Sequence, residues 1–150
     1  MFELIRRFIT LSAFPNRNFL KARLAPLSAY MGTTVFLAIL ASAIDSFFVV
    51  RQIAYVPWLI LHFIGLMITL LLWFALFALI VQVLVRMILP KPWTYRHAFP
   101  YAVAASVVAI PVTILSFQLY GTETAALTLF LLNGLYAVVP LVLARRKKRT

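Results

Sequence analysis

The chain is poor in charge, and above all in acidic charge. Of its 150 residues only 11% are charged, and three of these are acidic: Glu3, Asp45 and Glu123. Soluble domains carry about 25% charged residues, whereas 65% of this chain is hydrophobic. So few charges cannot cover so much apolar surface in water. The composition excludes a soluble enzyme and a free nucleic-acid-binding domain, and it predicts a protein whose solvent is the lipid bilayer.

Residues and patterns that catalysis requires are also missing. The absence of cysteine excludes disulfides, thiolate chemistry and iron–sulfur ligation. The sequence contains no Gly-rich phosphate loop and no nucleophile–base pair. Three scattered carboxylates, none expected deep in a span, form neither the converging set of divalent-metal phosphoryl chemistry nor an intramembrane proton site. We therefore expect no enzymatic activity, no metal and no cofactor.

Four segments are long and apolar enough to span a membrane, which takes roughly 20 residues. They are predicted at residues 27–44, ending at Asp45, and at 58–85, 100–119 and 125–144. No charge occurs from Gln52 to Val85, but these 34 residues are too few for two spans and a turn. One long span, tilted or running beyond the membrane, fits better. A polar turn at residues 121–124 joins the last two spans as a hairpin.

The distribution of basic residues predicts the orientation of these spans. With four spans, 13 of the 14 basic residues fall on the side of the two termini, and only Arg51 falls on the other side. By the positive-inside rule both termini are cytoplasmic. We expect a multi-pass membrane protein with both termini in the cytoplasm.

The first residues have the pattern of an amphipathic helix. One side is apolar at helical spacing and the other is polar, with Glu3 and Arg7 placed for an i,i+4 pair. The apolar positions are Met1, Leu4, Ile5, Phe8 and Leu11. This pattern predicts a helix in the cytoplasmic interface, ended by Pro15. The predicted organisation is an interfacial and basic segment at 1–25, a membrane domain at 26–144 and a basic tail at 145–150.

Basic side chains next to the spans are expected to contact anionic lipid headgroups, each contributing roughly 1 kcal/mol. They are Arg6, Arg7, Lys21, Arg23, Arg145, Arg146, Lys147, Lys148 and Arg149. The expected partners are the anionic bilayer and other membrane proteins or copies of this chain. RNA contact by the tail is the less favoured alternative, and no nucleic-acid partner is expected.

A few polar or helix-bending residues fall within the spans: Asn133, Gly134, Pro111, Thr113 and His62. Asn133 is interpreted as an interhelical hydrogen bond, with a polar position on a solute path as the alternative. His62 is expected to be a hydrogen-bonded structural residue, and pH sensing is its alternative. Haem ligation by His62 and His97 is excluded because they are expected on opposite sides of the membrane.

Small residues four apart let helices approach closely in lipid. The pairs are Ala38 with Ser42, Ala102 with Ser106, and Ala105 with Ala109. Packing inside one bundle is favoured over dimerisation.

Three segments resemble a bacterial family. They are Phe8–Pro15 (FITLSAFP), Asn18–Ala25 (NFLKARLA) and Tyr95–Pro100 (YRHAFP). Their pattern is similar to that of integral membrane proteins of unknown function that are labelled maltodextrin-utilisation-associated membrane proteins. The resemblance implies a short aromatic-Ser-aromatic-Pro segment and a basic element before a first span, and no catalytic residues. The chain departs from the family between its first two spans, where residues 45–57 replace an extracytoplasmic insertion.

The sequence thus predicts an all-α membrane protein, a four-transmembrane-helix bundle preceded by an amphipathic interfacial helix. The favoured function is a non-enzymatic accessory or scaffold subunit that acts through helix contacts. The alternative is a small oligomeric channel or carrier, whose cationic mouths would favour an anionic solute.

The basic-residue distribution makes the topology testable with reporter fusions. An alkaline phosphatase reporter should be inactive at Thr150 and active within residues 121–124, because the enzyme folds only outside the cytoplasm. A green fluorescent protein fusion at each position serves as the control, with the opposite pattern. Phosphatase activity at Thr150 would contradict the four-span topology.

Overall fold

A computed structural model describes residues 2–49 and 55–146 of the chain. Met1, Arg51, Lys147, Lys148 and Arg149 lie outside the described residues. Over this part of the chain all regular structure is helical. The elements in order are α1 (Phe2–Ser12), the 3-10 helix η1 (Arg17–Leu24), α2 (Leu27–Val49), α3 (Tyr55–Ile88), α4 (Tyr95–Tyr120) and α5 (Thr122–Arg146).

Helices α2, α3, α4 and α5 are each long and apolar enough to cross a membrane. The predicted fold, a four-helix membrane bundle with a short amphipathic helix before it, is confirmed. α3 has 34 residues and, at a rise of 1.5 Å per residue, is about 50 Å long. This exceeds the ~30 Å hydrocarbon layer. The expectation of one long segment that tilts or runs beyond the membrane fits this helix.

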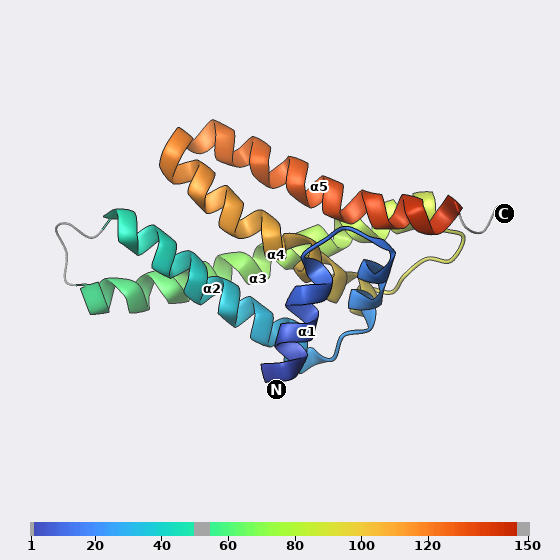
Figure 1. Ribbon diagram of the computed structural model, residues 1–150, viewed down its shortest axis with the longest axis horizontal. Coiled ribbons are helices and arrows are strands. Elements are labelled where there is room, and N and C mark those ends of the chain that lie inside the picture. The colour runs from blue at the N-terminus through green and yellow to red at the C-terminus, as the bar shows by residue number, and fades with distance from the viewer. Residues whose placement is uncertain (1, 50–54, 147–150) are drawn as a thin grey trace.

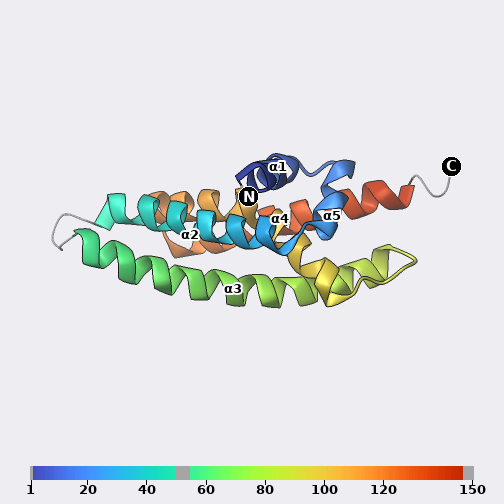
Figure 2. The ribbon, with the colours of Figure 1, turned by 90° about the horizontal axis from the view of Figure 1, so that it is seen from below.

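Helix α4 occupies the centre of the molecule and contacts each of the other five described elements. In Figure 2, α3 lies along one face and α1 along the opposite face, with α2, α4 and α5 between them. α4 and α5 form a hairpin in Figure 1, and α2 and α3 lie alongside each other. The predicted close packing of small residues within one bundle is confirmed, because all six residues of the three spaced pairs are buried: Ala38, Ser42, Ala102, Ser106, Ala105 and Ala109.

Three predicted span boundaries differ most from the helix ends. α4 begins at Tyr95, five residues before the predicted start at residue 100. α2 does not end at Asp45 but continues to Val49, because the apolar residues after Asp45 extend the helix. The predicted four-residue polar turn is a single residue, Gly121, between α4 and α5. Gly121 has φ 88°, a conformation that glycine adopts without steric cost. Its N–H donates to the carbonyl of Phe117 and so closes the last turn of α4.

The N-terminal segment, residues 2–24, packs against the helix bundle and does not lie on the lipid surface alone. Phe8, whose side was expected to face the interface, is buried against protein, as is Phe19 on η1. Gly32 on α2 leaves space for Ile5, since a Cβ at residue 32 would lie 2.5 Å from Ile5 Cδ1. The hydroxyl of Tyr136 on α5 donates to the carbonyl of Ala13 at 2.8 Å. Thus α1 and η1 belong to the folded core.

This docking can be tested with two phenylalanine substitutions on the same helix. Phe8 is 3% exposed and Phe2 is 88% exposed, so Phe8→Glu places a charge in the protein interior and Phe2→Glu does not. In detergent, Phe8→Glu should release α1 and abolish hydrogen-exchange protection over residues 2–24, while α3 and α4 stay protected. Phe2→Glu should leave that protection unchanged. Equal loss of protection in both variants would mean that α1 is held by lipid or detergent alone.

Candidate functional site

Three polar side chains from three spanning helices meet where α2 and α3 are joined. Asp45 Oδ2 lies 2.7 Å from His62 Nε2. The side-chain amide of Gln118 on α4 donates to Asp45 Oδ1. Only 17% of the Asp45 side chain and 24% of the His62 side chain are exposed. The carboxylate therefore accepts hydrogen bonds from both neighbouring helices and links α2, α3 and α4.

Local structure places each member of this cluster. Asp45 lies one turn before the end of α2, and His62 lies about two turns after the start of α3. Because these helices are antiparallel neighbours, the two side chains reach each other. The imidazole stacks on Trp58, one turn earlier on α3, with ring centroids 5.4 Å apart and an interplanar angle of 13°. This stacking fixes the plane of the ring, so that Nε2 faces the carboxylate.

A cavity of about 340 Å³ adjoins the cluster. Asp45, His62 and Thr113 contribute its polar groups, and its walls are apolar, including Leu66, Ile114 and Phe117. Among the described residues, the buried hydroxyl of Thr113 has no hydrogen-bond partner. Since a water molecule takes about 30 Å³ of liquid volume, the cavity has room for several waters or a small solute. Its polar lining consists of a carboxylate–imidazole pair and a hydroxyl group.

Asp45 is the acidic residue on which this cluster is built. It lies in the last turn of the candidate span Leu27–Phe48, so it is not deep in a span, as expected, but its carboxylate is bonded to two other spanning helices. The cost of placing a carboxylate there is offset by its two donors. His62 is hydrogen-bonded, as expected. The sequence contained one signal for this site, the apolar residues 47–49 that follow Asp45 and Ser46 and continue the helix.

A second polar contact lies elsewhere in the bundle. The hydroxyl of Ser106 on α4 donates to Asn133 Oδ1 on α5 at 2.7 Å, and Asn133 Nδ2 donates to the Leu129 carbonyl at 3.0 Å. Asn133 is only 2% exposed. The interhelical hydrogen bond expected for Asn133 is therefore confirmed, with Ser106 as the partner that sequence reasoning did not identify.

The five polar or helix-bending residues selected from the sequence thus lie at different places in the bundle and do not form one site. His62 and Thr113 line the cavity, whereas Asn133 pairs with Ser106. Gly134 follows Asn133 and is close to no other helix, since a Cβ there would meet no atom within 4 Å. Pro111 lies inside α4, which remains helical through it, although proline removes one backbone hydrogen bond.

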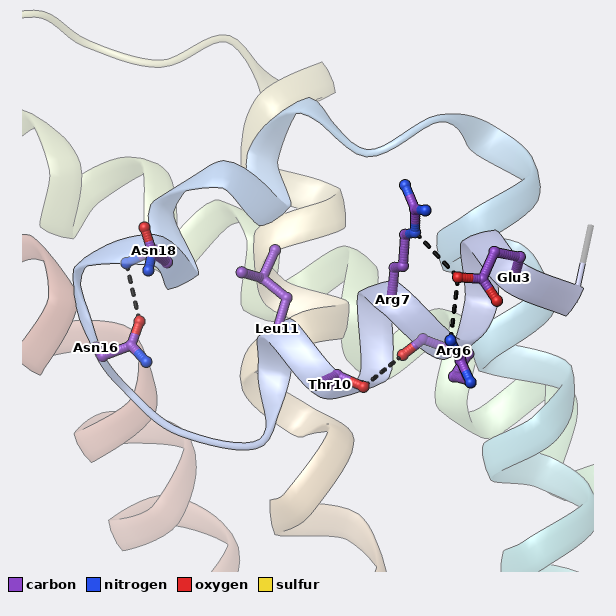
Figure 3. Close-up of a pocket in the computed structure, with 7 residues that line it drawn as sticks. All are labelled: Glu3, Arg6, Arg7, Thr10, Leu11, Asn16 and Asn18. Carbon is purple, nitrogen blue, oxygen red and sulfur yellow. Dashed lines mark hydrogen bonds and ion pairs between the residues drawn. The ribbon is translucent and has the colours of Figure 1, made fainter.

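The basic residues expected at lipid headgroups have different surroundings. Figure 3 shows Arg6 and Arg7 turned toward Glu3 at the edge of an open groove of about 690 Å³. Their distances to Glu3 Oε1 are 3.2 and 3.1 Å, which confirms the predicted pair of Glu3 with Arg7. Lys21 and Arg145 are exposed, and the side chain of Arg146 lies outside the described part of the structure. Arg23 is half-buried, with its guanidinium carbon 4.9 Å from the centroid of the Trp93 ring.

Comparisons of the chain with protein-family models, with curated proteins and with solved structures find no match.

The polar cluster should contribute measurably to stability. Asp45→Ala leaves His62 and Gln118 without their acceptor, which typically costs about 1–3 kcal/mol. We expect a melting temperature several degrees lower in detergent, since 1 kcal/mol corresponds to roughly 2–4 °C at this size. Asp45→Ala combined with His62→Ala should cost less than the sum of the single changes. Glu123→Ala, at an exposed acid in the first turn of α5, is the control; an equal loss there would remove the special role of Asp45.

Proposed function

We propose that the chain is a non-enzymatic accessory or scaffold subunit of the bacterial cytoplasmic membrane. It acts through contacts of its spanning helices with other membrane proteins or with copies of itself. Both termini lie in the cytoplasm, where the basic residues contact anionic lipid.

The Ser106–Asn133 contact is the observation that carries this proposal. A solute path needs polar groups that are free to meet the solute. Here the most deeply buried amide bonds a hydroxyl of the neighbouring helix and a carbonyl of its own helix. The alanines around Ser106, including Ala102 and Ala105, are fully buried, so this part of the α4–α5 interface is closely packed. These polar groups hold helices together.

The resemblance to the maltodextrin-utilisation-associated family supports the same role, because it implies no catalytic residues. The first two segments that carry the resemblance are far in the sequence from the third but pack near it, since α1 and η1 both contact α4. Phe19 of one segment meets Tyr101, which directly follows another, with ring centroids 5.1 Å apart. We propose membership of this family on that basis.

A small oligomeric channel or carrier is the second candidate, and the cavity at Asp45 favours it. The cationic ends of the spans would attract an anionic solute. The carboxylate of Asp45 would repel an anionic solute. Among the residues that line this cavity, His62 is the one whose side chain can carry a positive charge. A carrier built on this cavity would therefore transport protons in preference to an anionic solute.

Proton flux into proteoliposomes separates the two functions. With a trapped pH-sensitive dye and an imposed potassium–valinomycin potential, vesicles that contain the wild-type chain should acidify no faster than empty vesicles. Asp45→Asn and Asn133→Leu should behave like the wild type, and pull-down from membranes in mild detergent should retain the same partners for all three.

The opposite result would favour the carrier. Flux above that of empty vesicles, lost in Asp45→Asn with an unchanged melting temperature, would overturn the scaffold role. Glu123→Gln is the matched acid control and should leave any such flux intact.

A further inference from the structure

A separate cavity lies where α2 and α4 begin, on the side of the molecule away from the Asp45 cluster. Its volume is about 320 Å³. η1 and the start of α2 form one wall, and the first turn of α4 forms the other. The residues that matter for its chemistry are Arg23, Leu24, Leu27, Tyr30, Arg96 and His97.

This cavity has positive charge that the protein does not neutralise. Two guanidinium groups and one imidazole line it, and no carboxylate does. Over residues 2–49 and 55–146, the ion pairs join Glu3 to Arg6 and Arg7, and Asp45 to His62. Glu123 lies in the first turn of α5, at the other end of α4. Arg23 and Arg96 thus have no acidic partner in the described part of the chain, and the cavity is built for an anion.

Two of its basic groups, Arg23 and His97, are held in place before any anion arrives. The guanidinium of Arg23 stacks on Trp93 at 4.9 Å, and the buried Trp93 ring packs edge-on against Tyr101 at 5.2 Å. The Nδ1 atom of His97 lies 2.9 Å from the hydroxyl of Thr94, which orients the imidazole. Preorganised donors lose less conformational entropy on binding than free surface lysines or arginines.

The position of the cavity identifies the kind of anion. Leu24 and Leu27 border it and are 66% and 65% exposed. Leu27 is also the first residue of the spanning helix α2. The cavity therefore lies where the apolar span meets the basic segment, at the level of lipid phosphates on the cytoplasmic side. Guanidinium groups bind phosphate oxygens with good geometry, and basic pockets at this depth bind anionic lipid headgroups.

We propose that this cavity is a specific binding site for the phosphate group of an anionic phospholipid. Arg23 and Arg96 bind the phosphate oxygens, and Leu24 and Leu27 contact the upper part of the acyl chains. This proposal gives Arg96 and His97 a specific role, in addition to the general electrostatic attraction between basic residues and the membrane. It is independent of whether the chain is a scaffold or a carrier.

Native mass spectrometry of the full chain in a non-ionic detergent tests the site. Phosphatidylglycerol should bind in preference to phosphatidylcholine. Arg96→Gln should weaken phosphatidylglycerol binding about fivefold, the value of one basic group near an anionic surface. Arg96 is exposed, so its loss should leave the melting temperature without lipid unchanged. Arg86→Gln removes an exposed arginine of the last turn of α3 that does not line the cavity, and it should change binding less than twofold.

Further arms separate the lipid from a free phosphate. Inorganic phosphate and glycerol 3-phosphate should fail to displace phosphatidylglycerol at equal concentration, because they lack the acyl chains that Leu24 and Leu27 contact. Displacement by either would reassign the cavity to a soluble phosphate compound and overturn the lipid proposal. Equal weakening by Arg86→Gln and Arg96→Gln, or no preference for phosphatidylglycerol, would reduce the effect to unspecific attraction and overturn the site altogether.

Discussion

The arrangement of the molecule depends on how closely its helices can approach α4. In a membrane the hydrophobic effect does not draw helices together, so they associate through close packing and hydrogen bonds. The buried middle of α4 is built from small residues, among them Ala102, Ala105 and Ala109, and its neighbours can pack against its backbone. This allows one helix to contact every other described element. It also brings α4 within reach of the polar groups of all three sites: Gln118 bonds Asp45, Ser106 bonds Asn133, and Arg96 lines the cavity that Arg23 also lines.

The central position of α4 also explains why the N-terminal segment folds onto the bundle. An amphipathic helix with an apolar side can rest on lipid or on protein, and the sequence pattern is the same for both. Near the start of α4 the aromatic rings of Tyr101 and Trp93 provide a surface that η1 covers with Phe19 and Arg23. Once η1 is placed there, the chain before it lies across α2, where Gly32 leaves space for Ile5.

Composition and charge were sufficient to predict the four spans, because apolar segments of this length are unfavourable in water and stable as helices across a membrane. The helical N-terminus and the Glu3–Arg7 pair followed from spacing. The interhelical hydrogen bond of Asn133, though not the identity of its partner, followed from the cost of an unpaired amide in lipid. The Asp45–His62 contact did not follow, because a lone carboxylate was treated as the end of a span. Seventeen positions separate the two residues in the chain, and their meeting depends on how α2 and α3 are paired. The third member, Gln118, comes from α4, and its position depends on packing that no local pattern encodes.

The scarcity of acidic residues determines which basic side chains have a partner within the chain. With a net charge of +11 and only three carboxylates, the chain cannot neutralise its own basic groups. One acid is bonded to Arg6 and Arg7, and another to His62. The third lies in the first turn of α5, where a negative charge interacts favourably with the helix dipole. None is left for Arg23 and Arg96, so the neutralising charge must come from outside the chain. In the proposed lipid site this charge is a lipid phosphate, and binding of the lipid to the folded chain would then stabilise this end of the molecule.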